Sequence, residues 1–208
     1  MTRVKICGLN DPPGFDAAVA SGADWIGLNF FAGSPRVVTP EQAAALAARR
    51  PADGPKLVGL FVEPEQDQIA HVLALVPLDI LQLYTTPDRA ADLATRLGKP
   101  FWLPVAVATA ADLPRDMAGA AALLVEGRAP AAATRPGGNA SRFDWSLIAG
   151  WPAPGPWLLA GGLTPQNVAA AVRATGAAAV DVSSGVETAP GRKDPARIHA
   201  FVAAARGG

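Results

Sequence analysis

Lys56-Leu57-Val58-Gly59-Leu60-Phe61-Val62 is a nearly continuous apolar run, and Ile80-Leu81-Gln82-Leu83-Tyr84 is a second one. A helical pattern over Glu65–Leu75 separates the two runs. Apolar runs without regular polar alternation are typical of parallel strands that are covered on both faces. The stretch therefore predicts a strand, a helix and a second strand parallel to the first.

The same alternation of apolar runs and Ala-rich helical patterns extends along the whole chain. Such a series of βα units without a long linker predicts an α/β protein, a closed (β/α)8 TIM barrel with a single domain over residues 1–208. The alternative is an open doubly wound sheet, which normally has a Gly-x-Gly-x-x-Gly turn after its first strand; Cys7-Gly8-Leu9-Asn10 stands there instead. The eight expected strands are Arg3–Leu9, Asp24–Phe30, Lys56–Val62, Ile80–Tyr84, Pro100–Val107, Ala121–Glu126, Pro156–Gly161 and Ala178–Ser183.

Three of the expected helices begin with a Thr-Pro pair, in which Thr is suited to the N-cap and Pro to the first helical position. These pairs are Thr39-Pro40, Thr86-Pro87 and Thr164-Pro165, and Gly98 is expected to end the second of these helices. The other helices are expected at Gly14–Ala20, Glu65–Leu75, Ala110–Asp116, Trp145–Gly150 and Pro195–Ala205, with Val168–Thr175 following the third Thr-Pro pair.

The composition excludes several classes of protein. The 18 basic residues balance the 18 acidic ones, so the chain lacks the excess positive charge of a nucleic-acid-binding protein. One cysteine cannot form an internal disulfide or a multi-cysteine zinc site. The chain has no apolar stretch long enough to cross a membrane, and its first residues do not resemble a signal peptide. We therefore expect a cytoplasmic protein whose partner is a small molecule, not a nucleic acid or a membrane.

Chemistry in such a barrel belongs at the carboxyl ends of the strands, and two ionisable residues stand there. Cys7 ends the first strand and could serve as a base if a nearby cation favours its thiolate; otherwise it is an inert buried thiol. Glu126 ends the sixth strand, where partial burial should raise the pKa of its carboxyl and suit a general acid. The alternative for Glu126 is a salt bridge at the rim with Lys5 or Arg128. Together the two residues predict proton transfer on one small substrate.

Two glycine-bearing turns follow the seventh and eighth strands. Gly161-Gly162 precedes an expected helix start, and Ser183-Ser184-Gly185 follows the last strand. Such turns can present backbone N–H groups to an anion, and this is the usual phosphate site of the architecture. Each turn alone could equally be only a tight turn, but two on adjacent strands favour phosphate binding.

Two further charged residues are candidates for substrate binding. Arg36 lies in a proline-containing loop and could bind a carboxylate or phosphate through two hydrogen bonds, although a solvated loop arginine is the plain alternative. Asp181 interrupts an apolar strand and needs a partner, such as Arg36 or a substrate hydroxyl. His71 and His199 lie in expected helices away from the strand ends, and no cluster of residues has the spacing of a metal site.

Several motifs resemble those of the phosphoribosylanthranilate isomerase family of tryptophan biosynthesis, and they occur in the family's order over essentially the whole chain. They are Val4-Lys5-Ile6-Cys7-Gly8-Leu9, Gly22-Ala23-Asp24-Trp25-Ile26-Gly27, Ser34-Pro35-Arg36, Gln82-Leu83, Phe143-Asp144-Trp145, Leu159-Ala160-Gly161-Gly162-Leu163, Pro165-Gln166-Asn167-Val168, Asp181-Val182-Ser183-Ser184-Gly185-Val186-Glu187 and Gly191-Arg192-Lys193-Asp194.

The resemblance implies an Amadori rearrangement of N-(5'-phosphoribosyl)anthranilate to the 1-deoxyribulose 5-phosphate derivative, without cofactor or metal. It implies Cys7 as general base, and Glu126 at the place of the acid, which is Asp in the family. The family's carboxylate-binding arginine falls on Arg36. Its phosphate site falls on Gly161, Gly162, Ser183, Ser184 and Gly185. The expected state is a monomer or homodimer.

The sequence departs from the family pattern in three places, and all three are expected at the rim of the site. Glu126 replaces the usual Asp, Tyr84-Thr85 replaces the usual His-Gly, and Ala140 replaces a usual Gly in the Gly127–Phe143 loop. Two alternatives therefore stay open. One is a diverged paralogue that binds a phosphorylated or aromatic ligand without catalysis, and the other is an isomerase of a different sugar phosphate.

Overall fold

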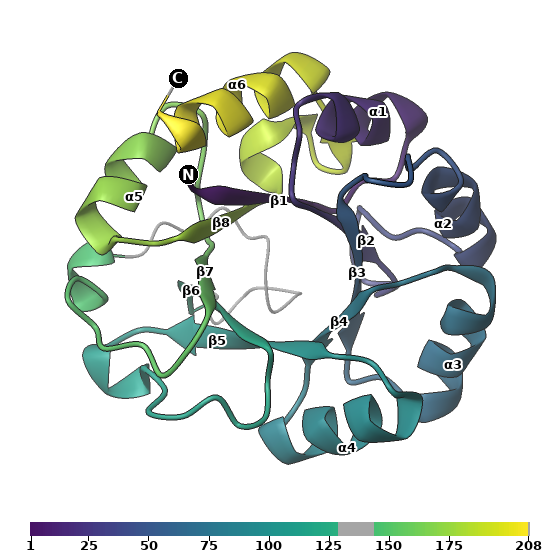
Figure 1. The fold of residues 1–208 in the computed structure, drawn as a ribbon, viewed down its shortest axis with the longest axis horizontal. Helices are drawn as coiled ribbons and strands as arrows, with labels where there is room; N and C mark the ends of the chain where they lie inside the picture. Colours follow the sequence, from purple (N-terminus) through teal and green to yellow (C-terminus); the bar gives the residue numbers. More distant parts are fainter. Residues whose placement is uncertain (129–143, 208) are drawn as a thin grey trace.

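The computed structural model describes residues 1–128 and 144–207, and within them eight parallel strands close into a barrel (Figure 1). Each strand pairs with the next along the chain, and β1 also pairs with β8, where Lys5 lies beside Asp181. The closure confirms the predicted (β/α)8 barrel and excludes the open sheet. The strands are β1 (Arg3–Cys7), β2 (Trp25–Asn29), β3 (Lys56–Val62), β4 (Ile80–Tyr84), β5 (Phe101–Val107), β6 (Ala122–Gly127), β7 (Trp157–Leu159) and β8 (Ala179–Val182).

The helices form a ring outside the strands (Figure 1). Two predicted helices were wrong in type: after β5 and after β6 the described residues form single 3-10 turns, η1 (Ala110–Asp112) and η2 (Trp145–Leu147), which are shorter than the expected Ala110–Asp116 and Trp145–Gly150. The α-helices are α1 (Pro12–Ala20), α2 (Pro40–Ala47), α3 (Gln66–Leu75), α4 (Pro87–Leu97), α5 (Val168–Thr175) and α6 (Pro195–Arg206).

The three threonines of the Thr-Pro pairs differ in whether they cap the helix that follows. Thr39 caps α2 as predicted, in a capping box with Gln42. Thr86 occupies the N-cap of α4 without a side-chain hydrogen bond, and Gly98 ends that helix with a φ of 62°. Thr164 is not an N-cap: a turn covers residues 165–167, Asn167 is the N-cap of α5, and the Asn167 side chain accepts from the Thr164 amide at 2.7 Å. Asn167 therefore occupies the N-cap position expected of Thr164, but its side chain caps no amide of the first turn of α5.

The apolar side chains form two separate clusters, one on each face of the barrel wall. The larger cluster lies between the strands and the helices and includes Val4 and Ile6. The smaller one fills the interior near the amino ends of the strands, and we call it the floor cluster. Because side chains alternate along a strand, residues two and four positions beyond the floor cluster also face the interior. The floor cluster consists of Trp25, Val58, Ile80, Trp102, Ala122, Leu158 and Ala179.

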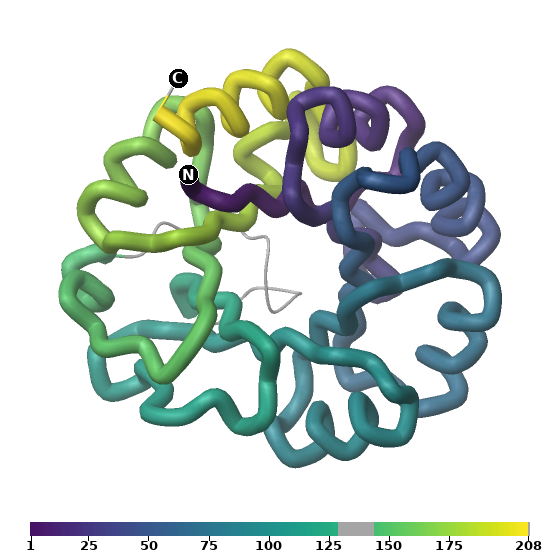
Figure 2. The backbone as a smooth tube through the Cα atoms, viewed as in Figure 1, coloured from purple at the N-terminus to yellow at the C-terminus, as the bar shows by residue number. Residues whose placement is uncertain are grey.

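The first strand and the last helix of the chain lie side by side where the barrel closes, as the smooth trace in Figure 2 shows. Helix α6 packs against α1 and β1, and the Arg206 side chain donates to Asp24 at 3.0 Å. Beyond β8, a 3-10 turn η3 (Ser184–Val186) leads into a small antiparallel ribbon of β9 (Glu187–Ala189) and β10 (Arg192–Lys193). Among the described residues, no helix has the length and apolar character needed to cross a membrane.

The long loop predicted after the sixth strand falls almost entirely outside the described residues. Only Gly127 and Arg128 of the Gly127–Phe143 segment are described, so Gly137, Gly138 and Ala140 lie outside them. Residues 1–128 and 144–207 build the described part of the site.

Candidate active site

A buried ion pair stands directly above the floor cluster. Lys5 of β1 donates from Nζ to Asp181 Oδ1 of β8 at 2.8 Å, and neither side chain is appreciably exposed. Burial alone would lower the pKa of Lys5, but Asp181 and Cys7 outweigh it and the pKa is raised. Asp181 was expected to pair with Arg36 or a substrate hydroxyl; Arg36 is not its partner, because strand register brings Lys5 alongside instead.

Cys7 lies one layer above Lys5, at the end of β1, with 6% of its surface exposed. The neighbouring strand makes room for it with a glycine. A Cβ at Gly27 would lie 2.9 Å from Cys7 Sγ and 3.2 Å from Lys5 Nζ, so the sulfur and the ammonium flank the same spot. Burial raises the pKa of the Cys7 thiol, and the positive charges of Lys5 and Lys193 offset this only in part. Burial thus outweighs the two cations, and the thiol is favoured over the thiolate in the resting protein.

Glu126 lies at the end of β6 and turns into the barrel, with 6% of its surface exposed. Its Oε1 accepts a hydrogen bond from the Tyr84 hydroxyl at 3.1 Å. Burial raises the pKa of Glu126 to about 8; Asp181 adds to this effect, whereas the Tyr84 hydrogen bond and Lys5 oppose it. The expected rise in pKa is thus present. Within residues 1–128 and 144–207 Glu126 has no salt bridge, because Arg128 pairs with Asp112 and Lys5 with Asp181, each at 2.8 Å.

Arg36 is neither a solvated loop arginine nor a partner of Asp181. Its Nε and Nη2 donate to the two carboxylate oxygens of Glu187 at 2.6 and 2.8 Å, and the pair is buried. Gly8 permits this arrangement, since it has a φ of +73° and a Cβ there would lie 2.5 Å from Arg36 Cδ. Lys193 donates to the same Glu187 at 2.7 Å and to the Ser183 carbonyl at 3.0 Å.

Glu187 and Lys193 were missed as site residues by sequence reasoning. Both stand in motifs that carried the family resemblance, but they follow the last strand instead of ending one. The short ribbon of β9 and β10 brings them back under the loop that holds Arg36. A carboxylate and two cations that are all buried form a fixed network, which orients the guanidinium of Arg36.

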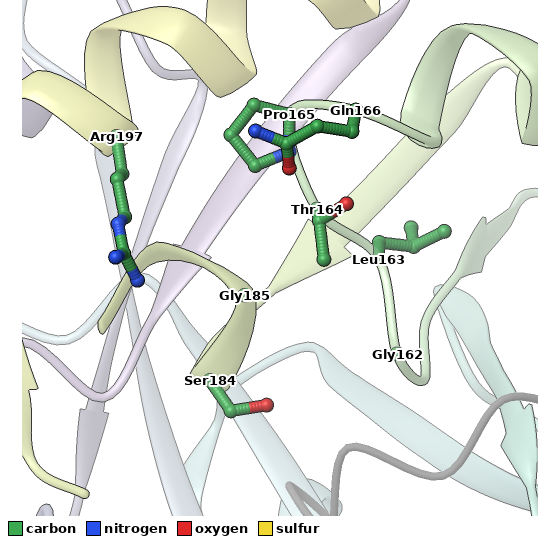
Figure 3. Close-up of a pocket in the computed structure, with 8 residues that line it drawn as sticks. All are labelled: Gly162, Leu163, Thr164, Pro165, Gln166, Ser184, Gly185 and Arg197. Carbon is green, nitrogen blue, oxygen red and sulfur yellow. The ribbon is translucent and has the colours of Figure 1, made fainter. Parts of the chain in front are cut away.

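The two glycine-bearing turns line one cleft of about 450 Å³ (Figure 3). Gly162, Ser184 and Gly185 belong to its wall, whereas Gly161 and Ser183 stand beside it in the same turns. A Cβ at Gly185 would lie 1.8 Å from the Leu163 carbonyl oxygen, so only glycine fits where the turns touch. Arg197 extends from α6 toward the turn of Ser184 and Gly185 in Figure 3 and adds a positive charge to the cleft wall. Its guanidinium also donates to the Glu187 carbonyl.

The strand-end residues thus gather in the interior above the floor cluster, with the anion-suited cleft on the side of β7 and β8. Alternation along the strands turns Cys7, Lys5, Tyr84, Glu126 and Asp181 toward the interior, where Lys5 bonds to Asp181 and Tyr84 to Glu126. His71 and His199 lie in α3 and α6, away from this space, as predicted. A base candidate, an acid candidate and an anion cleft therefore open on the same end of the barrel.

Comparisons with known proteins agree with this geometry. The profile described as N-(5'phosphoribosyl)anthranilate (PRA) isomerase matches residues 4–204. The N-(5'-phosphoribosyl)anthranilate isomerase of Acidiphilium cryptum is 54% identical over 205 residues, which are 99% of this chain and 98% of that protein. The crystal structure of phosphoribosyl anthranilate isomerase from Thermotoga maritima is 32% identical, with a TM-score of 0.84 and 100% of each chain covered. A phosphoribosyl anthranilate isomerase in complex with reduced 1-(o-carboxyphenylamino)-1-deoxyribulose 5-phosphate matches with a TM-score of 0.83 and 32% identity, again over 100% of each chain. The chain belongs to the phosphoribosylanthranilate isomerase family.

Proposed function

We propose that this protein converts N-(5'-phosphoribosyl)anthranilate to 1-(2-carboxyphenylamino)-1-deoxyribulose 5-phosphate by acid and base catalysis. The observation that carries the proposal is the buried Glu126 carboxyl, whose pKa of about 8 keeps it protonated at neutral pH in the layer that also holds Cys7. A protonated acid and a thiol beside a buried ammonium are the two groups that an Amadori rearrangement needs.

In the proposed reaction Glu126 acts first, as the general acid. Its carboxyl gives a proton to the ring oxygen of the ribose, and the ring opens to an iminium ion as the C1–O bond breaks. The Cys7 thiolate then removes the proton from C2. The electron pair of the C2–H bond forms the C1=C2 double bond, the π pair of the C=N bond moves to nitrogen, and the resulting enolamine tautomerises to the ketone. At neutral pH the thiolate is the minor form of Cys7, and the adjacent Lys5 ammonium stabilises it. Neither step requires a cofactor or a metal ion.

The binding roles follow from the atoms that the protein leaves available. Arg36 uses Nε and Nη2 for Glu187, and within the described residues its Nη1 has no acceptor, so this edge suits the carboxylate of the anthranilate. Asp181 binds Lys5 through Oδ1, which leaves Oδ2 for a substrate hydroxyl. The phosphate is assigned to the backbone N–H groups of Gly161, Gly162, Ser183, Ser184 and Gly185, beside the cleft that Arg197 lines.

The test is turnover by the purified protein, followed by chromatographic separation of substrate and ketose product. Cys7→Ala should lower kcat by about 10²–10⁴-fold, which is the usual contribution of one proton-transferring group. Substrate deuterated at C2 should react more slowly with the wild-type protein, because the C2–H bond breaks. His71→Ala, on the exposed side of α3, is the matched control and should retain full activity.

Unchanged turnover in Cys7→Ala would refute the assignment of the base. Binding of a reduced product analogue without turnover by the wild type would instead favour the non-catalytic paralogue, and turnover of a different aminoaldose phosphate would favour the other isomerase. Complementation of a bacterial strain that lacks this isomerase tests the activity in a cell.

Location and oligomeric state belong to the same proposal. A phosphorylated, doubly anionic substrate does not cross membranes unaided, which supports a cytoplasmic location, and cell fractionation tests it. We infer a monomer or a homodimer; the Thermotoga maritima relative is described as dimeric. Light scattering of the purified chain distinguishes the two states.

A further inference from the structure

Three interior side chains form a chain of hydrogen bonds that ends on the acid. Gln82 and Tyr84 lie two residues apart on β4, and Glu126 lies on β6. Gln82 Nε2 donates to the Tyr84 hydroxyl oxygen at 3.3 Å, and the Tyr84 hydroxyl donates to Glu126 Oε1 at 3.1 Å. Gln82 and Glu126 are buried and Tyr84 is partly buried, so water competes little with these bonds.

The length of Glu126 is what allows the contact. Strand β5 separates β4 from β6, so the two backbones are about 10 Å apart at the usual strand spacing. Ala106 is the β5 residue in register with Glu126, and its methyl group leaves the space between them open. Aspartate is shorter by one methylene, about 1.5 Å, and would not reach the tyrosine hydroxyl. The two departures from the family pattern at positions 84 and 126 are therefore in direct contact.

The direction of the bonds also decides which oxygen of the acid carries the proton. The Gln82 amide occupies a lone pair of the Tyr84 oxygen, so the tyrosine hydrogen is directed to Glu126 Oε1. Oε1 is then the acceptor, and the proton of the neutral carboxyl resides on Oε2. Within residues 1–128 and 144–207, no protein hydrogen bond reaches Oε2, which suits an oxygen that serves the substrate.

We propose that Tyr84 is a positioning residue for Glu126, which holds the longer acid across β5 and keeps its proton on Oε2. The inference rests on the proposed function, since it deepens the role of the acid. Among the described residues, three groups act on the Glu126 carboxyl: Tyr84 from β4, Lys5 from β1 and Asp181 from β8. Of these, Tyr84 is the one that donates a hydrogen bond to it.

The first experiment removes only the hydroxyl, with Tyr84→Phe. We expect kcat to fall by about 10–100-fold, because a displaced catalytic group costs on that order, while KM changes little. The pKa of Glu126 should rise above about 8, because the Tyr84 hydrogen bond favours the ionised carboxylate. Carbon-13 NMR of labelled glutamate carboxyls measures that pKa, with Glu126→Gln identifying the signal. A merely structural role of the ring would leave the pKa where it is.

The control removes a similar hydrogen bond from Thr85, the residue that follows Tyr84 in the chain. Thr85 Oγ1 donates to the exposed Glu63 carboxylate at 2.8 Å, so Thr85→Ala also deletes a hydroxyl-to-carboxylate bond. Thr85→Ala should leave both kcat and the pKa of Glu126 unchanged. If both variants behave like the wild type, or both lose activity equally, the inference is overturned.

The second experiment is a double-mutant cycle with Glu126→Asp. The shorter acid cannot reach Tyr84, so Tyr84→Phe should have no further effect on kcat in the Glu126→Asp background. Equal losses from Tyr84→Phe in the two backgrounds would overturn the inference. The proposed function fails differently, by absence of turnover in the wild type, and the NMR titration of Tyr84→Phe would then still test the contact.

Discussion

The interior of this barrel contains two regions built by the same strands, and they differ in almost every physical respect. At the amino ends, the floor cluster is apolar and closely packed, with Trp25 and Trp102 edge to face at 5.2 Å between ring centroids. Asp181 and Glu126 follow two and four residues later on β8 and β6, and with Lys5 of β1 they place ionisable groups in the interior. Strands β6 and β8 thus contribute to the apolar packing with their first inward residue and to the chemistry with their last.

The difference between the two regions also explains why proton transfer is favoured at the carboxyl ends of the strands. The floor cluster keeps water out from below, so the groups above it are desolvated and their mutual interactions are strong. Desolvation is the largest influence on the pKa of both Cys7 and Glu126 and raises both. The polar layer is therefore expected to be the less stable of the two regions, in keeping with the usual conflict between stability and activity.

The largest effect is expected from Lys5→Met, which removes one charge of the buried pair and leaves Asp181 without its partner. Breaking a buried ion pair typically costs about 3–5 kcal/mol of unfolding free energy. Turnover should also fall, because the Cys7 thiolate loses its neighbouring ammonium. Urea denaturation measures the first effect and kcat the second.

A matched double variant separates the two consequences. Lys5→Met with Asp181→Leu replaces the whole pair by apolar groups, which is often neutral for stability. The double variant should therefore regain most of the stability but none of the activity. If Lys5→Met alone were as stable as the wild type, the pair would contribute nothing to the fold and the comparison between the two regions would fail.

A second large effect concerns the dependence of stability on pH. The folded pKa of Glu126, about 8, lies above the ordinary value of 4.5, so between these pH values the folded protein holds one proton that the unfolded chain has lost. Stability from this group is complete below about pH 4.5, declines as the pH rises toward 8, and changes no further above that. Glu126→Gln cannot ionise in either state and should gain on the wild type by about 1.4 kcal/mol per pH unit in this interval.

Unfolding free energies of the two proteins at pH 5, 6, 7 and 8 test this prediction. The difference should grow steadily in favour of the inactive Glu126→Gln. A difference that is constant with pH would mean that Glu126 is ionised in the folded protein, which would also contradict its role as an acid.

The sequence predicted the strands and the strand-end positions of this site better than the contacts between its side chains. The apolar runs and the positions of Cys7 and Glu126 at strand ends follow from local pattern, because register and alternation within one strand are local properties. The partners do not, since they depend on which strands become neighbours. Lys5 meets Asp181 only when β1 closes against β8, 176 residues apart along the chain.

Two other contacts escaped sequence reasoning for related reasons. Arg36 pairs with Glu187 because a ribbon after β8 folds back to it, and no local pattern predicts that return. Tyr84 and Glu126 were recognised as two separate departures from the family pattern, although they are joined by one hydrogen bond across β5. The raised pKa of Glu126 was predictable because burial at a strand end is a local expectation, whereas the raised pKa of Cys7 depends on a balance between burial and two lysines.

The smallest effect tests whether the two regions are independent. Trp102→Phe replaces an indole ring of the floor cluster by a smaller phenyl ring and weakens the edge-to-face contact with Trp25. We therefore expect a loss of about 1–2 kcal/mol in unfolding free energy. The groups above it keep their hydrogen bonds, and kcat and the NMR-measured pKa of Glu126 should match the wild type. If the pKa of Glu126 instead fell toward its ordinary value, water would have reached the polar layer through the loosened floor. The floor cluster would then be part of the catalytic apparatus, because it would maintain the desolvation on which the acid depends.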